Sequence, residues 1–343
     1  MVENTYNVRK LLEVVGLSAF LLDIADVCVN GNPVVFYVVL DLAALTIVLV
    51  ATGLNMEQDS CYLCHCTKSQ MRTPGVSVEI TKSMKDFPKS MLPQAFPLKY
   101  LIYDPTHGIA NTVSLLMHAT WAVIDDRSRK FLGLLLEGLY GFNICGKTLN
   151  SRYKGKKTKQ FVWDKVRMPE KAAPAYTGEC VQGRKTGMEW MLDGIKDVNK
   201  TIRNAAGETH TVENILGQVW VLVFGMICIL YTQFPTEDDR QRYRRLGTRL
   251  QALWTTFLPI STFCPTTHHF CHHFADMLDL HGSLYPLLNE GTESTNKEFF
   301  DRWLDLTTQF MKNKFTGFSG LEEILRVQVA AWEVLRLGLV DCL

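Results

Sequence analysis

The sequence has 343 residues, enough for one large domain or two ordinary ones. Apolar residues make up 47% and charged residues 21%, a composition that excludes a disordered chain. There are 36 Lys and Arg against 35 Asp and Glu, so the net charge of +1 excludes a protein that is basic throughout, although it leaves local basic patches open.

The N-terminus carries Glu3 and Glu13 in the stretch that a secretion signal would occupy, so we expect no signal peptide. Ten cysteines are too few for a small disulfide scaffold of this length. Outside a secretory compartment thiols stay reduced. We therefore predict reduced thiols or metal ligands rather than disulfides.

Two long apolar runs, 34–54 and 218–234, raise the question of a membrane segment. The first contains Asp41, whose burial at a bilayer centre would cost about 2.5–3.5 kcal/mol. Residues 34–39 are β-branched or aromatic, and Leu and Ala dominate after Asp41. This pattern predicts a buried strand, an aspartate at its end and then a core helix. The second run is predicted to be a core helix, and we expect no membrane partner.

The rest of the chain reads as loops followed by helices. Residues 67–100 contain four prolines, which break any long element, and from residue 101 the pattern is mainly helical. Helices are predicted near 108–145, 187–205, 211–232, 238–257, 266–280, 293–312 and 319–340, with a basic loop at 146–186. The predicted fold class is α+β and mostly helical.

A metal site is indicated by Cys61 and Cys64, because a Cys-x-x-Cys turn lets two thiolates reach one zinc ion. The partner ligands could come from a cluster of four histidines in the segment 267–274, which are His268, His269, His272 and His273. Two cysteines and two histidines would complete a tetrahedral structural site. The alternative is a buried reduced turn and a surface histidine cluster. Spacing alone does not select which two of the four histidines would bind zinc.

Carboxylates at two places in the sequence are candidates for a catalytic role. Asp41 follows an apolar strand, so its side chain would emerge at a sheet edge, although it could equally cap the helix after it. Glu290 and Glu293 stand at the start of a predicted amphipathic helix, where acidic residues often serve only to complement the helix dipole.

Two basic clusters are candidates for DNA contact, since phosphate neutralisation needs local charge density. The first is the loop 147–167, where eight Lys or Arg are interleaved with aromatic residues. Its candidate contacts are Lys154, Lys156, Lys157, Lys159 and Arg167. The second consists of arginines at helical spacings, Arg240, Arg242, Arg244, Arg245 and Arg249. A solvated loop and a salt-bridged helix face remain the alternatives.

Taken together, these motifs resemble the catalytic subunit of the V(D)J recombinase and the related Transib-type DDE transposases. The resemblance is strongest from His268 through the stretch GSLYPLLNEGTESTNK, 282–297, and weaker at 41–64. It selects His268 and His273 as zinc ligands with Cys61 and Cys64. It also implies a partial RNase H-like core with a large helical zinc-binding insertion. The segment YLIYDPTHGIANTV, 100–113, resembles a further family loop to which we assign no chemistry.

The resemblance implies two-metal DNA cleavage, in which carboxylates hold Mg²⁺ or Mn²⁺. Asp41 matches the second catalytic aspartate, although its separation from the Cys-x-x-Cys turn differs by one residue from that in the family. Glu293 matches the catalytic glutamate. The first aspartate has no counterpart, because Asp23 and Asp26 match no such strand. We therefore expect a chain that does not cleave DNA alone.

The resemblance also implies an organisation in three parts. Residues 1–57 would hold partial RNase H-like strands and a helix, 58–281 the helical zinc-binding insertion, and 282–343 the catalytic-Glu helix and terminal helices. We expect a nuclear protein that binds DNA, either at terminal repeats or non-specifically. The formation of a homodimer is left as an open alternative. The alternative is a non-enzymatic zinc-stabilised scaffold or binding module.

Overall fold

A computed structural model of the chain describes residues 28–29, 32–33, 37–40, 42–49, 60–74, 76, 78–141, 144–145, 148–149, 161–176, 183–196, 198–204 and 206–288. The chain divides into two units, Met1–Leu288 and Asn289–Leu343, and everything described lies in the first. The predicted helices at 293–312 and 319–340 lie outside the described residues.

Helices make up most of the described structure, as the sequence predicts. They are α3 (Leu42–Val48), α4 (Lys68–Met71), α5 (Pro105–Val123), α6 (Asp126–Tyr140), α8 (Gly187–Ile195), α9 (Val212–Leu230), α10 (Glu237–Phe257), α11 (Pro265–His268) and α12 (Phe274–His281). A π-helix, His269–His273, joins α11 to α12.

Among the described residues, strands are short and occur in two-stranded pairs. Four pairs are antiparallel: β1 (Cys28–Val29) with β2 (Asn32–Pro33), β5 (Ile144–Cys145) with β6 (Thr148–Leu149), β7 (Val166–Arg167) with β8 (Arg184–Lys185), and β9 (Thr201–Arg203) with β10 (Thr209–Thr211). The fifth pair is parallel and joins β3 (Val38–Leu40) to β4 (Leu101–Tyr103). An RNase H-like sheet is larger than these pairs and stays a prediction.

The helix boundaries follow from capping side chains. Asp104 begins α5 by accepting a hydrogen bond from the N–H of Thr106, and Pro105 takes the first helical position, where its missing N–H costs nothing. A reciprocal Thr236–Asp239 capping box begins α10. Gly141 ends α6 with a φ of 67°, a left-handed conformation that suits glycine.

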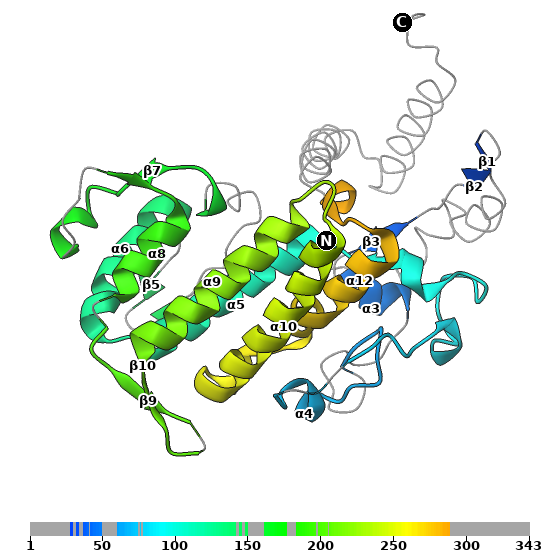
Figure 1. Cartoon of the computed structure of the whole chain (residues 1–343), viewed down its shortest axis with the longest axis horizontal. Coiled ribbons are helices and arrows are strands. Elements are labelled where there is room, and N and C mark those ends of the chain that lie inside the picture. The colour runs from blue at the N-terminus through cyan, green and yellow to red at the C-terminus, as the bar shows by residue number, and fades with distance from the viewer. Residues whose placement is uncertain are drawn as a thin grey trace, which may run out of the picture. The chain divides into compact units, whose positions relative to one another are not determined.

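The long helices pack around α9, which contacts both α5 and α10 (Figure 1). Its Trp220 is fully buried and donates an indole hydrogen bond to Thr120 of α5, at 3.1 Å. From the other side α10 contributes a buried stripe at helical spacing, which includes Tyr243, Leu250 and Trp254. Figure 1 shows α6 and α8 toward one end of these helices, with α12 and β3 toward the other.

Three predictions about elements need correction. The predicted helix at 108–145 is two helices, because the chain becomes extended at Ile124 and Asp125 caps a new helix. The helix predicted at 187–205 ends at Ile195 and is followed by the hairpin β9–β10. Residues 101–103 form a strand rather than the start of the helical region, since they pair with β3.

The apolar run at 218–234 falls largely within α9, as predicted. Within the described part of the chain, α9 is the one helix long and apolar enough to cross a membrane, and 56% of its apolar window is buried inside the protein.

Candidate metal centre

The two cysteines project from a turn that backbone hydrogen bonds hold closed. The carbonyl of Leu63 accepts from the N–H groups of Thr81 and Lys82, at 2.9 and 3.0 Å, and the N–H of Leu63 donates to Cys61 Sγ at 3.3 Å. The Lys82 ammonium group donates to the Cys61 carbonyl at 2.7 Å. These contacts fix both thiols in the core, where Cys61 and Cys64 are buried.

The histidines lie on a helical segment that changes its winding in the middle. In an α-helix, residues five apart point about 140° away from each other around the axis. In a π-helix the hydrogen bonds join residues five apart, so these residues lie one above the other. The π-helix His269–His273 therefore brings His273 close to His268, with a ring-centroid distance of 4.9 Å.

Residues of α10 stabilise this unusual helix. Tyr243 donates its hydroxyl hydrogen bond to the Phe270 carbonyl at 2.7 Å, and the tyrosine is fully buried. A Cβ at Gly247 would lie 1.9 Å from the Cys271 carbonyl oxygen, so only glycine allows α10 to approach so closely. The segment also approaches α5 closely, because a Cβ at Gly108 of α5 would lie 2.5 Å from the Phe274 ring.

The turn and the helix meet in a buried cluster of four ligand groups. Single donor atoms of Cys61, Cys64, His268 and His273 all lie within 4.8 Å of one another. The sulfur of Cys61 is 3.3 Å from His273 Nε2, and that of Cys64 is 3.5 Å from His268 Nε2. In tetrahedral zinc sites, neighbouring donor atoms stand about 3.3–3.8 Å apart. The residues present therefore fit a zinc ion.

His273 is oriented by a carboxylate. Its Nδ1 lies 3.0 Å from Asp276 Oδ2, and Asp276 in turn accepts a hydrogen bond from Arg244 at 3.0 Å. Donation from Nδ1 leaves Nε2 as the lone-pair atom that faces the cysteines, the arrangement found where a carboxylate supports a zinc-binding histidine. Burial alone would lower the pKa of His273, but the hydrogen bond with Asp276 and the neighbouring Cys64 raise it.

The surroundings also favour deprotonation of one thiol. Burial acts to raise the pKa of Cys61, but hydrogen bonds from Cys64 and from backbone N–H groups, together with the Lys82 charge, bring this pKa below its usual value. The pKa of Cys64 is raised by its hydrogen bond to Cys61 and by burial. Thiolates are the form that binds metal, so the Lys82 charge and the backbone N–H groups around Cys61 favour metal binding.

The structure thus brings together all four residues that the sequence resemblance selected as zinc ligands. Sequence reasoning missed the supporting residues Asp276, Tyr243 and Gly247. Of these, Asp276 could have been found, because it lies one helical turn after His273.

The predicted catalytic carboxylates Asp41 and Glu293 lie outside the described residues. The strand before Asp41 is described, and the N–H of Asp104 donates to the Leu40 carbonyl at 2.8 Å. Asp104 is buried, caps α5 and lies 2.8 Å from His107 Nδ1. The segment 100–113, to which the sequence assigns no chemistry, is therefore the second strand of the parallel pair, a buried aspartate and the start of α5.

The predicted DNA contacts Lys154, Lys156, Lys157 and Lys159 also lie outside the described residues, while Arg167 is exposed on β7. The arginines of α10 are largely engaged by acidic neighbours. Arg240 pairs with Glu237, Arg244 with Asp276 and Asp279, and Arg245 with Asp238. This is the salt-bridged helix face that the sequence left as the alternative.

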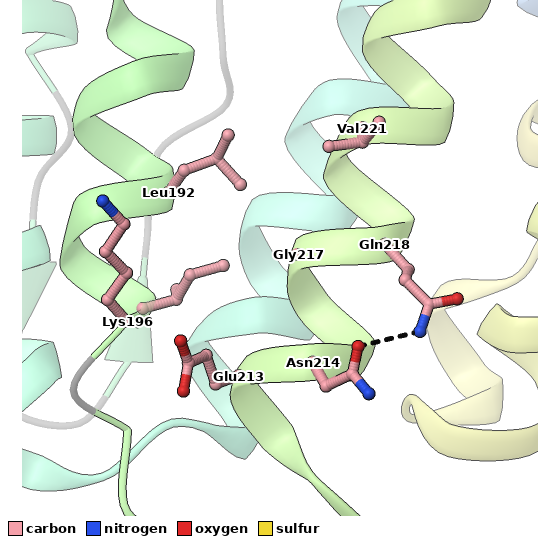
Figure 2. A pocket seen from close by; sticks show the side chains of 8 residues that line it. Leu192, Lys196, Glu213, Asn214, Gly217, Gln218 and Val221 are labelled. Atoms are coloured by element: carbon pink, nitrogen blue, oxygen red, sulfur yellow. Dashed lines mark hydrogen bonds between the residues drawn. The ribbon is translucent and has the colours of Figure 1, made fainter.

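An open groove of about 600 Å³ lies between α8 and α9 (Figure 2), and none of its lining residues belongs to the candidate metal centre. Its lining residues are Leu192, Ile195, Lys196, Glu213, Asn214, Gly217, Gln218 and Val221. Gln218 donates to Asn214 within the groove, at 2.9 Å.

Compared with family models, with curated proteins and with solved structures, the chain matches none. The resemblance to the V(D)J recombinase and Transib family therefore rests on the residues quoted above.

Proposed function

We propose that this chain is a zinc-stabilised, DNA-associated nuclear protein derived from a DDE-type transposase or recombinase. The observation that carries the proposal is the buried cluster of Cys61, Cys64, His268 and His273. These are the four positions that the family resemblance selects, and they come from two segments about 200 residues apart in the chain.

The zinc ion has a structural role in this proposal. All four ligand residues are buried and belong to the protein, so no coordination position is left for water or substrate. Such a closed site contributes its binding free energy to folding. One ion would hold the Cys61–Cys64 turn to α11 and the π-helix, which pack on α5 and α10. Zinc content per chain, measured on the purified protein, tests this role.

The DNA-directed role rests on the resemblance and on charge. Asp41 follows β3, and Glu293 lies in the segment that resembles the family most closely. The resemblance matches only two of the three family carboxylates within these residues. The Mg²⁺ or Mn²⁺ that such carboxylates would hold supplies Lewis-acid activation of water and leaving oxygen. We propose that the chain associates with DNA through the loop 147–167 and does not cleave it alone.

A nicking assay tests the proposed inactivity. Pure protein is incubated with supercoiled plasmid and Mg²⁺ or Mn²⁺, and Glu293→Gln is the matched variant. The expected result is no nicking above background by either protein. Metal-dependent nicking that disappears in Glu293→Gln would show an active enzyme and would refute this part of the proposal.

A zinc-stabilised scaffold without DNA binding is the second candidate. It is favoured by the pairing of Arg240, Arg244 and Arg245 with acidic residues, which removes one expected phosphate-binding surface. The two candidates differ in their affinity for DNA. A dissociation constant that depends steeply on salt supports the DNA-associated protein, whereas no measurable binding at low salt supports the scaffold.

A further inference from the structure

A third imidazole touches the candidate metal centre without belonging to the group of four ligands. His269 Nε2 lies 3.4 Å from Cys61 Sγ, almost the same distance as the ligand His273 Nε2 from that sulfur. His269 is 1% exposed. It is outside the group whose donor atoms all lie within 4.8 Å of one another, so it contacts a ligand rather than the metal position.

Aromatic neighbours fix the position of this ring. His269 stacks on Tyr62 with a centroid distance of 4.9 Å and an angle of 16° between the rings, and its edge meets Tyr103 at 5.7 Å. Tyr62 is itself held, because its hydroxyl donates to the Leu101 carbonyl at 3.2 Å and accepts from the Tyr103 N–H at 3.0 Å. The imidazole is therefore fixed against the sulfur by contacts with β4.

The direction of the hydrogen bond follows from the two partners. A zinc-bound thiolate carries no proton and can only accept, so the nitrogen that faces it must carry the hydrogen. The other nitrogen, Nδ1, has no hydrogen-bond partner among the described residues. A proton on Nδ1 would therefore be a buried donor without an acceptor, which is costly. Both considerations place the proton on Nε2.

We propose that His269 is a positioning residue that donates an N–H···S hydrogen bond to the zinc-bound thiolate of Cys61. The donated hydrogen bond withdraws electron density from the sulfur, as does the second donor to the same atom, the N–H of Leu63 at 3.3 Å. A thiolate with less electron density reacts more slowly with electrophiles. His269 thus protects the zinc site against thiol-directed loss of the metal. This inference rests on the proposed zinc site.

The substitution His269→Phe tests the proposal, because it keeps an aromatic ring against Tyr62 and removes the N–H. The matched control is His272→Phe, which removes a buried imidazole from the same π-helix. Its Nε2 has no hydrogen-bond partner among the described residues. Zinc content is measured first for all three proteins. Zinc release by a disulfide reagent such as dithionitrobenzoate is then followed with a zinc-sensitive dye.

The expected result is one zinc per chain in every protein and release about tenfold faster from His269→Phe, with His272→Phe like the wild type. With Co²⁺ in place of zinc, the sulfur-to-metal charge-transfer band of His269→Phe should move to longer wavelength. Equal release rates from zinc-loaded wild type and His269→Phe, together with equal bands from the two Co²⁺-loaded proteins, would overturn the proposal. Absence of zinc from the wild type would instead refute the zinc site itself.

A second measurement needs no substitution, so it tests the proposal even where the His269→Phe protein does not fold. Long-range ¹H–¹⁵N spectra of the zinc-loaded wild type report which imidazole nitrogen carries the proton. The proposal expects the His269 proton on Nε2. A proton on Nδ1 of His269 would overturn the proposal while leaving the zinc site intact.

Discussion

Gly247 of α10 and Cys271 of the π-helix are in backbone contact, because a Cβ on the glycine would lie 1.9 Å from the cysteine carbonyl oxygen. A carbonyl cannot move aside as a flexible side chain can, so any larger residue at 247 must push the two helices apart. The contact lies within the segment 268–273, which carries both histidines of the candidate metal centre.

We therefore expect Gly247→Ala to destabilise the protein by about 3 kcal/mol, since overpacking at a rigid contact moves backbone. Zinc affinity should fall with it. Gly217→Ala on α9 is the control, because nothing lies within 4 Å of its added Cβ and alanine favours a helix. Chemical denaturation measures both. Equal free energies of unfolding for the Gly247→Ala and Gly217→Ala proteins would show that the Gly247–Cys271 contact is not as close as described.

Asp276→Asn should weaken zinc binding about 10- to 100-fold, because the amide no longer orients and polarises His273 as the carboxylate does. Competition with a chelator of known zinc affinity measures the change. Asp279→Asn is the control, since Asp279 also pairs with Arg244 but has no contact with His273 among the described hydrogen bonds. Similar losses in both variants would mean that the Arg244 ion pairs, rather than the His273 contact, support the site.

The lowered pKa of Asp193 should make the stability of the protein depend on pH. Burial acts to raise its pKa, but Lys185, Tyr176 and Lys196 lower it below the usual value through hydrogen bonds. A lowered folded pKa stabilises the protein above the unfolded pKa of about 3.9, and this stability is lost as the pH falls through the folded value.

Asp193→Asn should therefore reduce the free energy of unfolding by about 1–2 kcal/mol at pH 7. The difference from wild type should hold down to about pH 5 and shrink below about pH 4. Denaturant titrations of both proteins at each pH measure it, and zinc loss common to both cancels in the difference. A difference that grows as the pH falls would show that the assigned sign is wrong.

Replacing the four lysines of the basic loop, Lys154, Lys156, Lys157 and Lys159, by glutamine should weaken binding to duplex DNA. Each lost phosphate contact should reduce the slope of log K against log salt by about 0.9. Fluorescence anisotropy over a salt series measures this slope. The control is Arg240→Gln with Arg244→Gln, whose charges are already paired with acids. An unchanged slope in the lysine variant, or an equal loss in the control, would contradict the assignment.

Local sequence signals were sufficient for part of the centre. The Cys61-x-x-Cys64 spacing is itself half of a zinc site. The order of strand, Asp41 and helix is also visible in the sequence, because β-branched and aromatic residues precede Asp41 and Leu and Ala follow it. The choice of His268 and His273 from four histidines came from the resemblance. It depends physically on a π-helix, which ordinary helical periodicity does not predict.

Contacts between distant segments were not predictable. β4 is three residues long and pairs with residues more than sixty positions earlier, so periodicity cannot distinguish it from the start of a helix. The Gly247–Cys271 contact and the Tyr62–His269 stack likewise join residues whose proximity exists only after the helices pack.

The zinc content of the purified chain is the most direct test of the account. Elemental analysis by mass spectrometry should find one zinc per chain in the wild type. Cys64→Ser and His273→Ala should lose both the metal and the cooperative unfolding transition, because the ion binds only the folded protein. The control variant Gln233→Ala, at an exposed position, should retain both. A wild-type protein that folds without zinc, or a Cys64→Ser protein that keeps a full equivalent, would contradict the account.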